Sequence, residues 1–143
     1  MILAYPVALE PDDKGGFIAS FVNVREAMTV GKDEANALYW AEDALVVALS
    51  GYLDSNRDIP KPSKPKRGQH TIELPTLVSM KLVIYQTMRD KNISQAELAD
   101  KLNCDARQVR RLLDIDHQSR MNQVEAALRI LGKKVLIDIR DAA

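Results

Sequence analysis

The chain has 143 residues, of which 46% are hydrophobic and 28% charged, a composition typical of a soluble globular protein with one or two domains. Residues 1–9 lack a basic leader and contain Pro6, and no apolar run approaches membrane-spanning length, so we expect neither a signal peptide nor a membrane anchor. Cys104, the single cysteine, excludes an internal disulfide and a cysteine-based zinc site, and we expect it to be a small core residue. These features predict a cytoplasmic protein.

The formal net charge of zero conceals a division along the chain. Residues 1–56 carry three basic and nine acidic side chains, a net charge of −6. The remaining 17 basic and 11 acidic side chains give residues 57–143 a net charge of +6. An acidic half repels nucleic acid, whereas a basic half attracts it. Two halves of opposite charge predict two partners of different kinds.

The first third of the chain predicts a hairpin, a third strand and a long helix. Residues 2–10 and 17–24 have the composition and alternation of strands, and residues 11–16, with two glycines, suit the turn between them. Residues 27–30 predict a short strand closed by Gly31, and a helix then runs from Lys32 or Asp33 to about Leu53. We expect this helix to pack across the sheet through a stripe of three- and four-residue spacing. The stripe comprises Ala35, Leu38, Tyr39, Glu42, Leu45, Val46 and Leu49.

Residues 57–69 predict a stiff, extended connector, because Pro60, Pro62 and Pro65 alternate with basic side chains. A nuclear-localisation or RNA-binding segment at 64–67 is an alternative reading of the same charges. Residues 70–74 alternate like a strand that rejoins the first sheet. The first domain is therefore predicted as β-β-β-α-β and ends near Pro75.

Residues 76–92 predict a helix, and residues 93–113 predict two short helices joined by a tight turn. Ser94 and Glu97 have the spacing of a capping box, which Asp105 and Gln108 repeat, and Asn103 accepts the left-handed backbone of a sharp helix exit. The expected inward positions are Leu98, Ala99 and Leu102, then Val109, Leu112 and Leu113. Inward apolar and outward arginine positions are typical of a DNA-reading helix-turn-helix.

A last helix is predicted over residues 122–131, ending at Gly132, and residues 133–140 alternate like a strand. A lone terminal strand has no partner within a helical domain. Its backbone is most simply paired with the same strand of a second copy, so we predict a dimer, with possible higher oligomers, built on Val135, Ile137 and Ile139. The fold class is α+β.

The sequence holds no phosphate-binding glycine loop, nucleophile elbow or cluster of metal ligands. His70 and His117 are far apart and stand beside no carboxylate or cysteine motif. We expect no catalytic site, no metal and no cofactor.

Several segments match a known pattern: Tyr5-Pro6-Val7, Gly15-Gly16-Phe17, residues 20–23, residues 27–31, Glu34-Ala35, residues 42–45 and Ile59-Pro60. This pattern resembles the HicB antitoxin family. Ser94-Gln95, residues 97–99, Leu102, Val109, Leu112 and Leu131-Gly132 are similar to the lambda-repressor/Cro-like helix-turn-helix class. The sequence departs from the HicB pattern at Asn23, Arg25 and Ala27, where Asp, Pro and Gly are common.

The resemblance implies a bacterial type II toxin–antitoxin system, in which such a protein blocks a small HicA-type mRNA endonuclease and represses the operon encoding both. It implies a partial RNase H-like fold for a toxin-binding domain, residues 1–75, followed by a DNA-binding and dimerisation domain, residues 76–143. Metal-dependent cleavage needs several converging carboxylates, which the hairpin acids do not supply, so we expect no enzymatic activity.

An RNA-binding toxin presents a basic surface, to which an acidic domain is complementary. The candidate toxin contacts are Glu10, Asp12, Asp13, Glu26 and Asp33, although for each one a merely solvated role is the alternative. The candidate DNA contacts are Gln95, which touches phosphate, and Arg107, Gln108 and Arg111, which face the major groove. Arg110 either contacts DNA or pairs with Asp114. A dimer predicts a palindromic operator.

A stand-alone transcriptional regulator whose N-terminal domain senses a small ligand is the main alternative function. It predicts an apolar pocket with convergent polar groups and no neighbouring toxin gene. An RNA-processing enzyme would need carboxylates that the sequence lacks.

Overall fold

The computed structural model describes residues 3–142, and the chain divides into two compact units, one up to Ser79 and one from Met80. The fold is α+β: an antiparallel sheet with one long helix is followed by four further helices. No helix within residues 3–142 is both long and apolar enough to cross a membrane.

The first unit is built on a four-stranded antiparallel sheet of order β3-β2-β1-β4. Its strands are β1 (Ala4–Pro11), β2 (Phe17–Phe21), β3 (Met28–Gly31) and β4 (His70–Glu73). The predicted hairpin is confirmed, because β1 pairs with β2 around a turn in which Gly15 has a φ of 88°. The predicted return of the fourth strand is also confirmed, since β4 pairs with β1.

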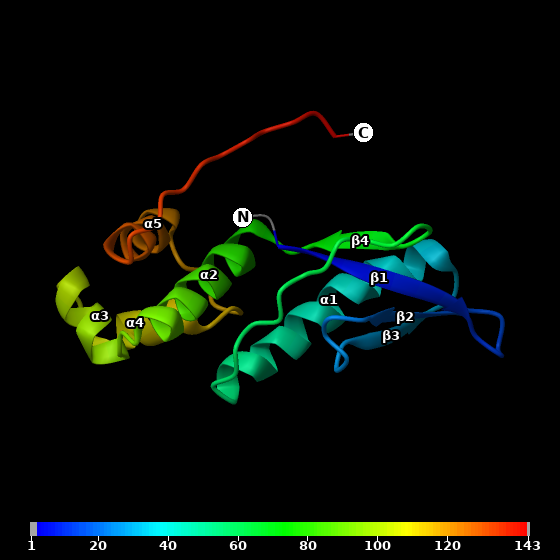
Figure 1. Ribbon diagram of the computed structural model, residues 1–143, viewed down its shortest axis with the longest axis horizontal. Helices are drawn as coiled ribbons and strands as arrows, with labels where there is room; N and C mark the ends of the chain where they lie inside the picture. The colour runs from blue at the N-terminus through cyan, green and yellow to red at the C-terminus, as the bar shows by residue number, and fades with distance from the viewer. Residues whose placement is uncertain (1–2, 143) are drawn as a thin grey trace. The chain divides into compact units, whose positions relative to one another are not determined.

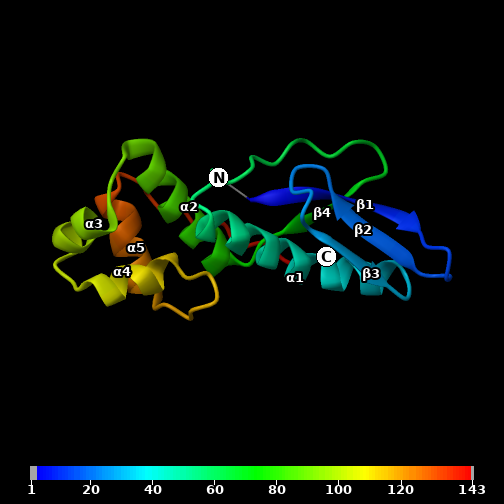
Figure 2. The ribbon, with the colours of Figure 1, turned by 90° about the horizontal axis from the view of Figure 1, so that it is seen from below.

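Helix α1 (Glu34–Asp54) lies across one face of this sheet (Figures 1 and 2). It begins where the Asp33 carboxylate accepts a hydrogen bond from the Asn36 backbone N–H, at 2.8 Å. The end of β3 approaches the helix so closely that a Cβ atom added to Gly31 would collide with the backbone nitrogen of Ala37. Small side chains therefore line this part of the helix–sheet contact.

The predicted inward stripe of α1 was wrong in its first half. The buried positions are Ala37, Ala41, Leu45, Leu49 and Tyr52. Only Leu45 and Leu49 belong to both sets. The larger side chains Tyr39 and Trp40 point outward, because the close approach at Gly31 leaves room only for alanines against the sheet.

Residues 56–69 form neither helix nor strand, but hydrogen bonds hold them against the first unit. The buried Tyr5 hydroxyl donates to the carbonyl of Pro60 at 2.6 Å, and burial raises the pKa of Tyr5 to about 12. The amide and the hydroxyl of Ser63 both donate to Oδ1 of Asn23, at 3.2 Å each. The predicted connector is thus anchored by hydrogen bonds, and its basic side chains Lys61, Lys64, Lys66 and Arg67 are exposed.

The second unit contains most of α2 (Thr76–Lys91), followed by α3 (Gln95–Leu102), α4 (Ala106–Leu113) and α5 (Met121–Ile130). Val124, Ala127, Leu128 and Leu131 are buried, as predicted. Gly132 closes α5 with a φ of 83°, which an L side chain rarely adopts. Cys104 is half-buried at the turn before α4, and burial raises the pKa of its thiol.

Lys81 is the one charged side chain that is fully buried among the described residues, at 0% exposure. Its Nζ donates to the carbonyls of Arg111, Asp114 and His117 at 2.9, 2.6 and 2.7 Å. The three N–H donors of this one ammonium group thus meet three carbonyl acceptors at the end of α4 and in the loop after it. Burial lowers the pKa of Lys81, against the opposing effect of Asp114 and Asp116. The sequence pattern around Lys81 does not predict this role.

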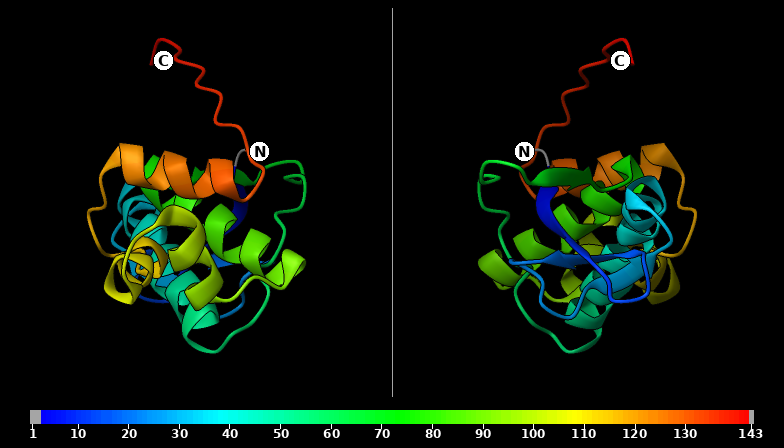
Figure 3. Two further views of the ribbon diagram at one scale, coloured as in Figure 1. Left: turned by 90° about the vertical axis from the view of Figure 1, so that its left-hand side faces the viewer. Right: turned by 90° about the vertical axis from the view of Figure 1, so that its right-hand side faces the viewer.

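Residues 133–140 are irregular in the single chain, and the strand that was expected to pair with a second copy stays a prediction. It leaves α5 on an extended path, clear of the helices of its own unit (Figures 1 and 3). Leu136, Ile137 and Ile139 are 81%, 73% and 89% exposed. A strand needs a hydrogen-bonded neighbour, and the described part of one chain supplies none for this segment.

Candidate nucleic-acid interface and partner surfaces

The predicted pair of short helices is formed by α3 and α4, which are joined by Asn103, Cys104 and Asp105. The full capping box opens α3: the Glu97 amide donates to Ser94 Oγ at 3.1 Å, and the Ser94 amide donates to Glu97 Oε1 at 3.3 Å. Asn103 ends α3 with a φ of 53°, in the left-handed region that was expected. Local hydrogen bonds therefore set the angle at which α4 begins.

The outward face of α4 is strongly basic. Val109 and Leu112 are buried, so Arg107, Arg110 and Arg111 fall on the opposite, exposed side of the helix. The Asp105 carboxylate caps the helix by accepting from the Gln108 amide at 2.8 Å, while the Gln108 side chain is half-buried. Three arginines on one short helix suit binding to a polyanion.

Gln95 and Arg110 are the other two residues of this surface that were expected to contact DNA. Gln95 is exposed in the first turn of α3, at the helix end where backbone N–H groups lack intrahelical partners. Arg110 and Asp114 form no ion pair in the described part of the chain, so the side chain of Arg110 is available to a partner along with Arg107 and Arg111.

The five acidic residues proposed for the toxin do not form one cluster. Glu10, Asp12 and Asp13 lie at the β1–β2 hairpin. Asp33 lies at the same end of the sheet, because Phe17 pairs with Pro11 on one side and with Gly31 on the other. Glu26 lies at the opposite end, because Met28, two residues later in the chain, pairs with Ser20 near the far end of β2. The structure therefore separates one candidate from the other four.

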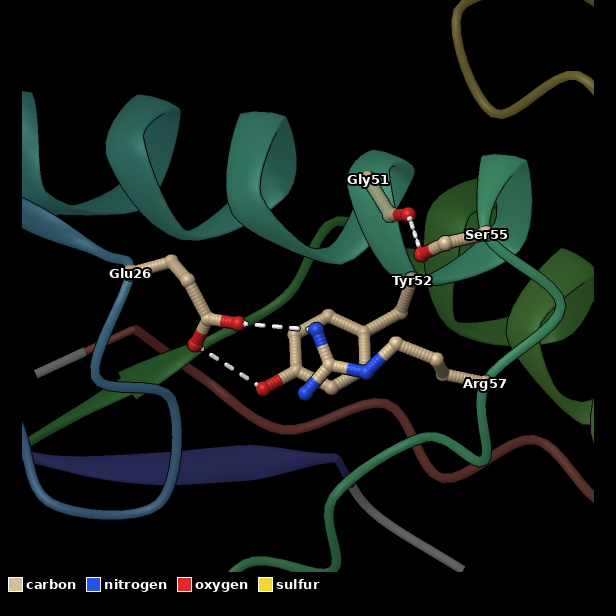
Figure 4. A network of polar contacts seen from close by, with 5 residues as sticks. All are labelled: Glu26, Gly51, Tyr52, Ser55 and Arg57. Atoms are coloured by element: carbon tan, nitrogen blue, oxygen red, sulfur yellow. Dashed lines mark hydrogen bonds and ion pairs between the residues drawn. The ribbon is translucent and has the colours of Figure 1, made fainter.

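Glu26 belongs instead to a polar network that links the loop before β3 to the end of α1 (Figure 4). Its carboxylate accepts from the Tyr52 hydroxyl at 2.9 Å and from Arg57 Nη1 at 3.1 Å. The guanidinium of Arg57 lies 4.0 Å from the centre of the Tyr52 ring. Hydrogen bonds from the backbone N–H of Glu26 itself, from Tyr52 and from Arg57 together hold the pKa of the Glu26 carboxyl below its ordinary value.

This network closes one end of an open groove between the β3 segment and α1, with a volume of about 530 Å³. The groove is lined by Glu26, Met28, Asp43, Ala44, Val47, Ala48, Gly51, Tyr52 and Arg57. The sequence pattern did not predict this groove, because Met28 and Val47 are ordinary residues for a strand and a helix. The only available signal was the small residue Gly51 within the helix.

Within residues 3–142, no three His, Cys, Asp or Glu side chains gather closely enough to hold a metal ion. The described chain thus presents a basic helix face in one unit, and an acidic hairpin end and an open groove in the other. These surfaces differ from one another in charge and in shape.

Comparison with known proteins identifies the family. The model described as a HicB-like antitoxin of bacterial toxin–antitoxin systems matches residues 4–83. The antitoxin HicB of Escherichia coli strain K12 is 35% identical over 93% of this chain and 96% of the relative. The antitoxin HicB of Pseudomonas fluorescens strain Pf0-1 is 33% identical over 96% of each chain, and antitoxin HicB 1 of Photorhabdus laumondii is 31% identical over 96% and 87%. The chain belongs to the HicB family of antitoxins.

Proposed function

We propose that this protein binds and inhibits a HicA-type mRNA endonuclease toxin and, as a dimer, represses its own operon. The observation that carries the proposal is the similarity to HicB antitoxins over more than nine-tenths of the chain. The protein acts in the cytoplasm by binding alone, without enzymatic activity.

The two roles divide along the chain. Residues 1–75 hold the toxin, with Glu10, Asp12, Asp13 and Asp33 attracting a basic surface and Glu26 acting from the opposite end of the sheet. Residues 76–143 bind DNA and dimerise. Opposite charge on the two partners increases the association rate and favours the correct partner over others.

Co-expression tests the toxin-binding half of this proposal. The toxin gene is expected beside the antitoxin gene, and its product alone should stop bacterial growth. Simultaneous expression of this protein should restore growth, and the two proteins should co-purify. A neighbouring gene whose product is harmless, or toxicity that this protein does not relieve, would favour the stand-alone transcriptional regulator instead.

Replacing Arg107 and Arg111 with alanine should abolish selective operator binding, because arginines that contact bases each contribute about 1–3 kcal/mol of discrimination. Electrophoretic mobility shift with operator and scrambled DNA measures the effect. Arg129→Ala, which removes an exposed arginine from α5, is the matched control. Toxin binding should be unchanged, and its loss together with DNA binding would indicate unfolding.

The dimer is proposed to form through the exposed C-terminal segment, with Val135, Ile137 and Ile139 on one side of a shared strand pair. Two copies of α4 would then reach half-sites roughly 34–36 Å apart on a palindromic operator.

Ile137→Asp should convert the dimer to a monomer at micromolar concentration, because it places a charge in each copy among the apolar side chains on the packed side of the strand pair. Leu136→Asp, on the opposite side of the alternation, should leave the dimer largely intact. Analytical ultracentrifugation distinguishes the two results. An unchanged dimer in both variants would show that the contact lies elsewhere.

A further inference from the structure

The groove between the β3 segment and α1 has an apolar floor that no other part of the first unit covers within the residues that the structure describes. Met28 is 62% exposed and Val47 is 65% exposed, and Ala44 and Ala48 also line the groove. A Cβ atom added to Gly51 would meet no heavy atom within 4 Å. An apolar side chain of a partner therefore has room to enter against these residues.

The groove also borders an open edge of the sheet. The order β3-β2-β1-β4 makes β3 an edge strand, so one side of its backbone has no neighbouring strand within residues 3–142. Edge strands offer N–H and C=O groups to an incoming extended segment. Docking at this edge would combine backbone hydrogen bonds with burial of the apolar floor.

The charge around the groove selects one kind of partner. Helix α1 contains four carboxylates, Glu34, Glu42, Asp43 and Asp54, and no lysine, arginine or histidine. Asp43 lines the groove and makes no side-chain hydrogen bond or ion pair within the described chain. At the far end, Tyr52 and Arg57 already hold Glu26 in place. The uncompensated charge is therefore negative, and a basic partner complements it.

We propose that this groove is the docking site of the toxin, an inference that rests on the proposed function. The toxin inserts an apolar side chain between Met28, Val47 and Gly51, and an adjacent lysine or arginine pairs with Asp43. A second copy of the antitoxin is the weaker candidate for this site, because two such acidic helices would repel one another.

The groove and the acidic hairpin end then affect different rate constants. The hairpin carboxylates act at long range, so they accelerate association in a way that salt screens. The groove contact is short-range and buried in the complex, so it determines how slowly the toxin leaves.

The test measures toxin binding kinetics, by biolayer interferometry with catalytically inactive toxin, for two matched pairs of variants of the full chain. Gly51→Leu fills the groove, whereas Ala35→Leu adds the same side chain to an exposed position of α1 outside the groove. Val47→Lys places a positive charge in the groove, whereas Ala35→Lys adds the same charge to an exposed position of α1 outside it. Thermal unfolding and operator binding confirm that each variant is folded.

Gly51→Leu and Val47→Lys should each weaken binding by roughly 30-fold or more, mainly through faster dissociation, as expected at the centre of an interface. The two control variants should stay within about threefold of the wild type. Asp12→Asn with Asp13→Asn should slow association at low salt and leave dissociation unchanged.

The outcomes separate the two proposals. If the wild-type protein does not bind the toxin, the proposed function fails and the docking site with it. If the wild type binds and both groove variants bind equally well, the docking inference alone is overturned. It is also overturned if the groove variants change the oligomeric state in solution while their toxin affinity stays at the wild-type value.

Discussion

Replacing Lys81 with methionine should destabilise the helical unit by about 3–5 kcal/mol, because three buried carbonyl groups lose their charged donor. Methionine nearly matches the length of the lysine side chain, so the loss reflects hydrogen bonds more than a cavity. The three acceptors, Arg111, Asp114 and His117, lie at the end of α4 and in the loop that follows it. The variant should therefore loosen α4 before the rest of the unit.

Amide hydrogen exchange measures this effect helix by helix, which matters because the chain has two units that need not unfold together. Protection in α4 should fall steeply, and operator binding should weaken with it. Lys91→Met is the control: Lys91 also donates to a carbonyl, that of Leu131 at 2.7 Å, but its side chain is exposed and the cost should be near 1 kcal/mol. Equal losses in the two variants would contradict a special role for burial.

Replacing Gly31 with alanine should cost the first unit about 3 kcal/mol, at the upper end of overpacking in a close-packed core. The new Cβ would lie 2.5 Å from the α-carbon and 2.8 Å from the Cβ of Ala37, and closer still to its backbone nitrogen. Backbone atoms of a helix yield less readily than the end of a side chain. Either α1 must move off the sheet, or β3 must detach from it.

Trp40, the single tryptophan, lies on α1 and reports the unfolding of this unit by fluorescence in urea. Gly51→Ala, in the same unit, should instead raise stability by about 0.5–1 kcal/mol, because alanine favours the helix and the added methyl group meets open space. A Gly31→Ala variant as stable as the wild type would show that the helix–sheet contact adapts without cost.

Elements specified by local interactions were predictable. The start and end of α3 depend on Ser94, Glu97 and Asn103, which act within a few residues of one another, so their spacing alone indicates the helix. The β1–β2 hairpin likewise follows from two alternating segments and a glycine turn. Even the basic face of α4 follows from the helical period once Val109 and Leu112 are assigned inward.

Contacts between residues that are far apart in the sequence were not predictable from the sequence pattern. Alanines and larger residues have similar helical spacing in α1, and only the close approach of Gly31 decides that Ala37 and Ala41 face the sheet. A lysine in α2 reads as solvent-exposed until three carbonyls surround it. The C-terminal segment has the alternation of a strand, yet a strand requires a partner that one chain does not provide.

The sequence by itself therefore determined the succession of elements, the helix caps, the charge difference between the two halves and, through its resemblance, the antitoxin family. These depend on neighbouring residues or on similarity along the chain. Tertiary structure alone decided which faces are buried, that Glu26 lies apart from the other acidic candidates, and that Met28, Val47 and Gly51 line one groove. Such placements depend on packing between segments far apart in sequence, where volume and hydrogen-bond geometry choose among patterns that look alike.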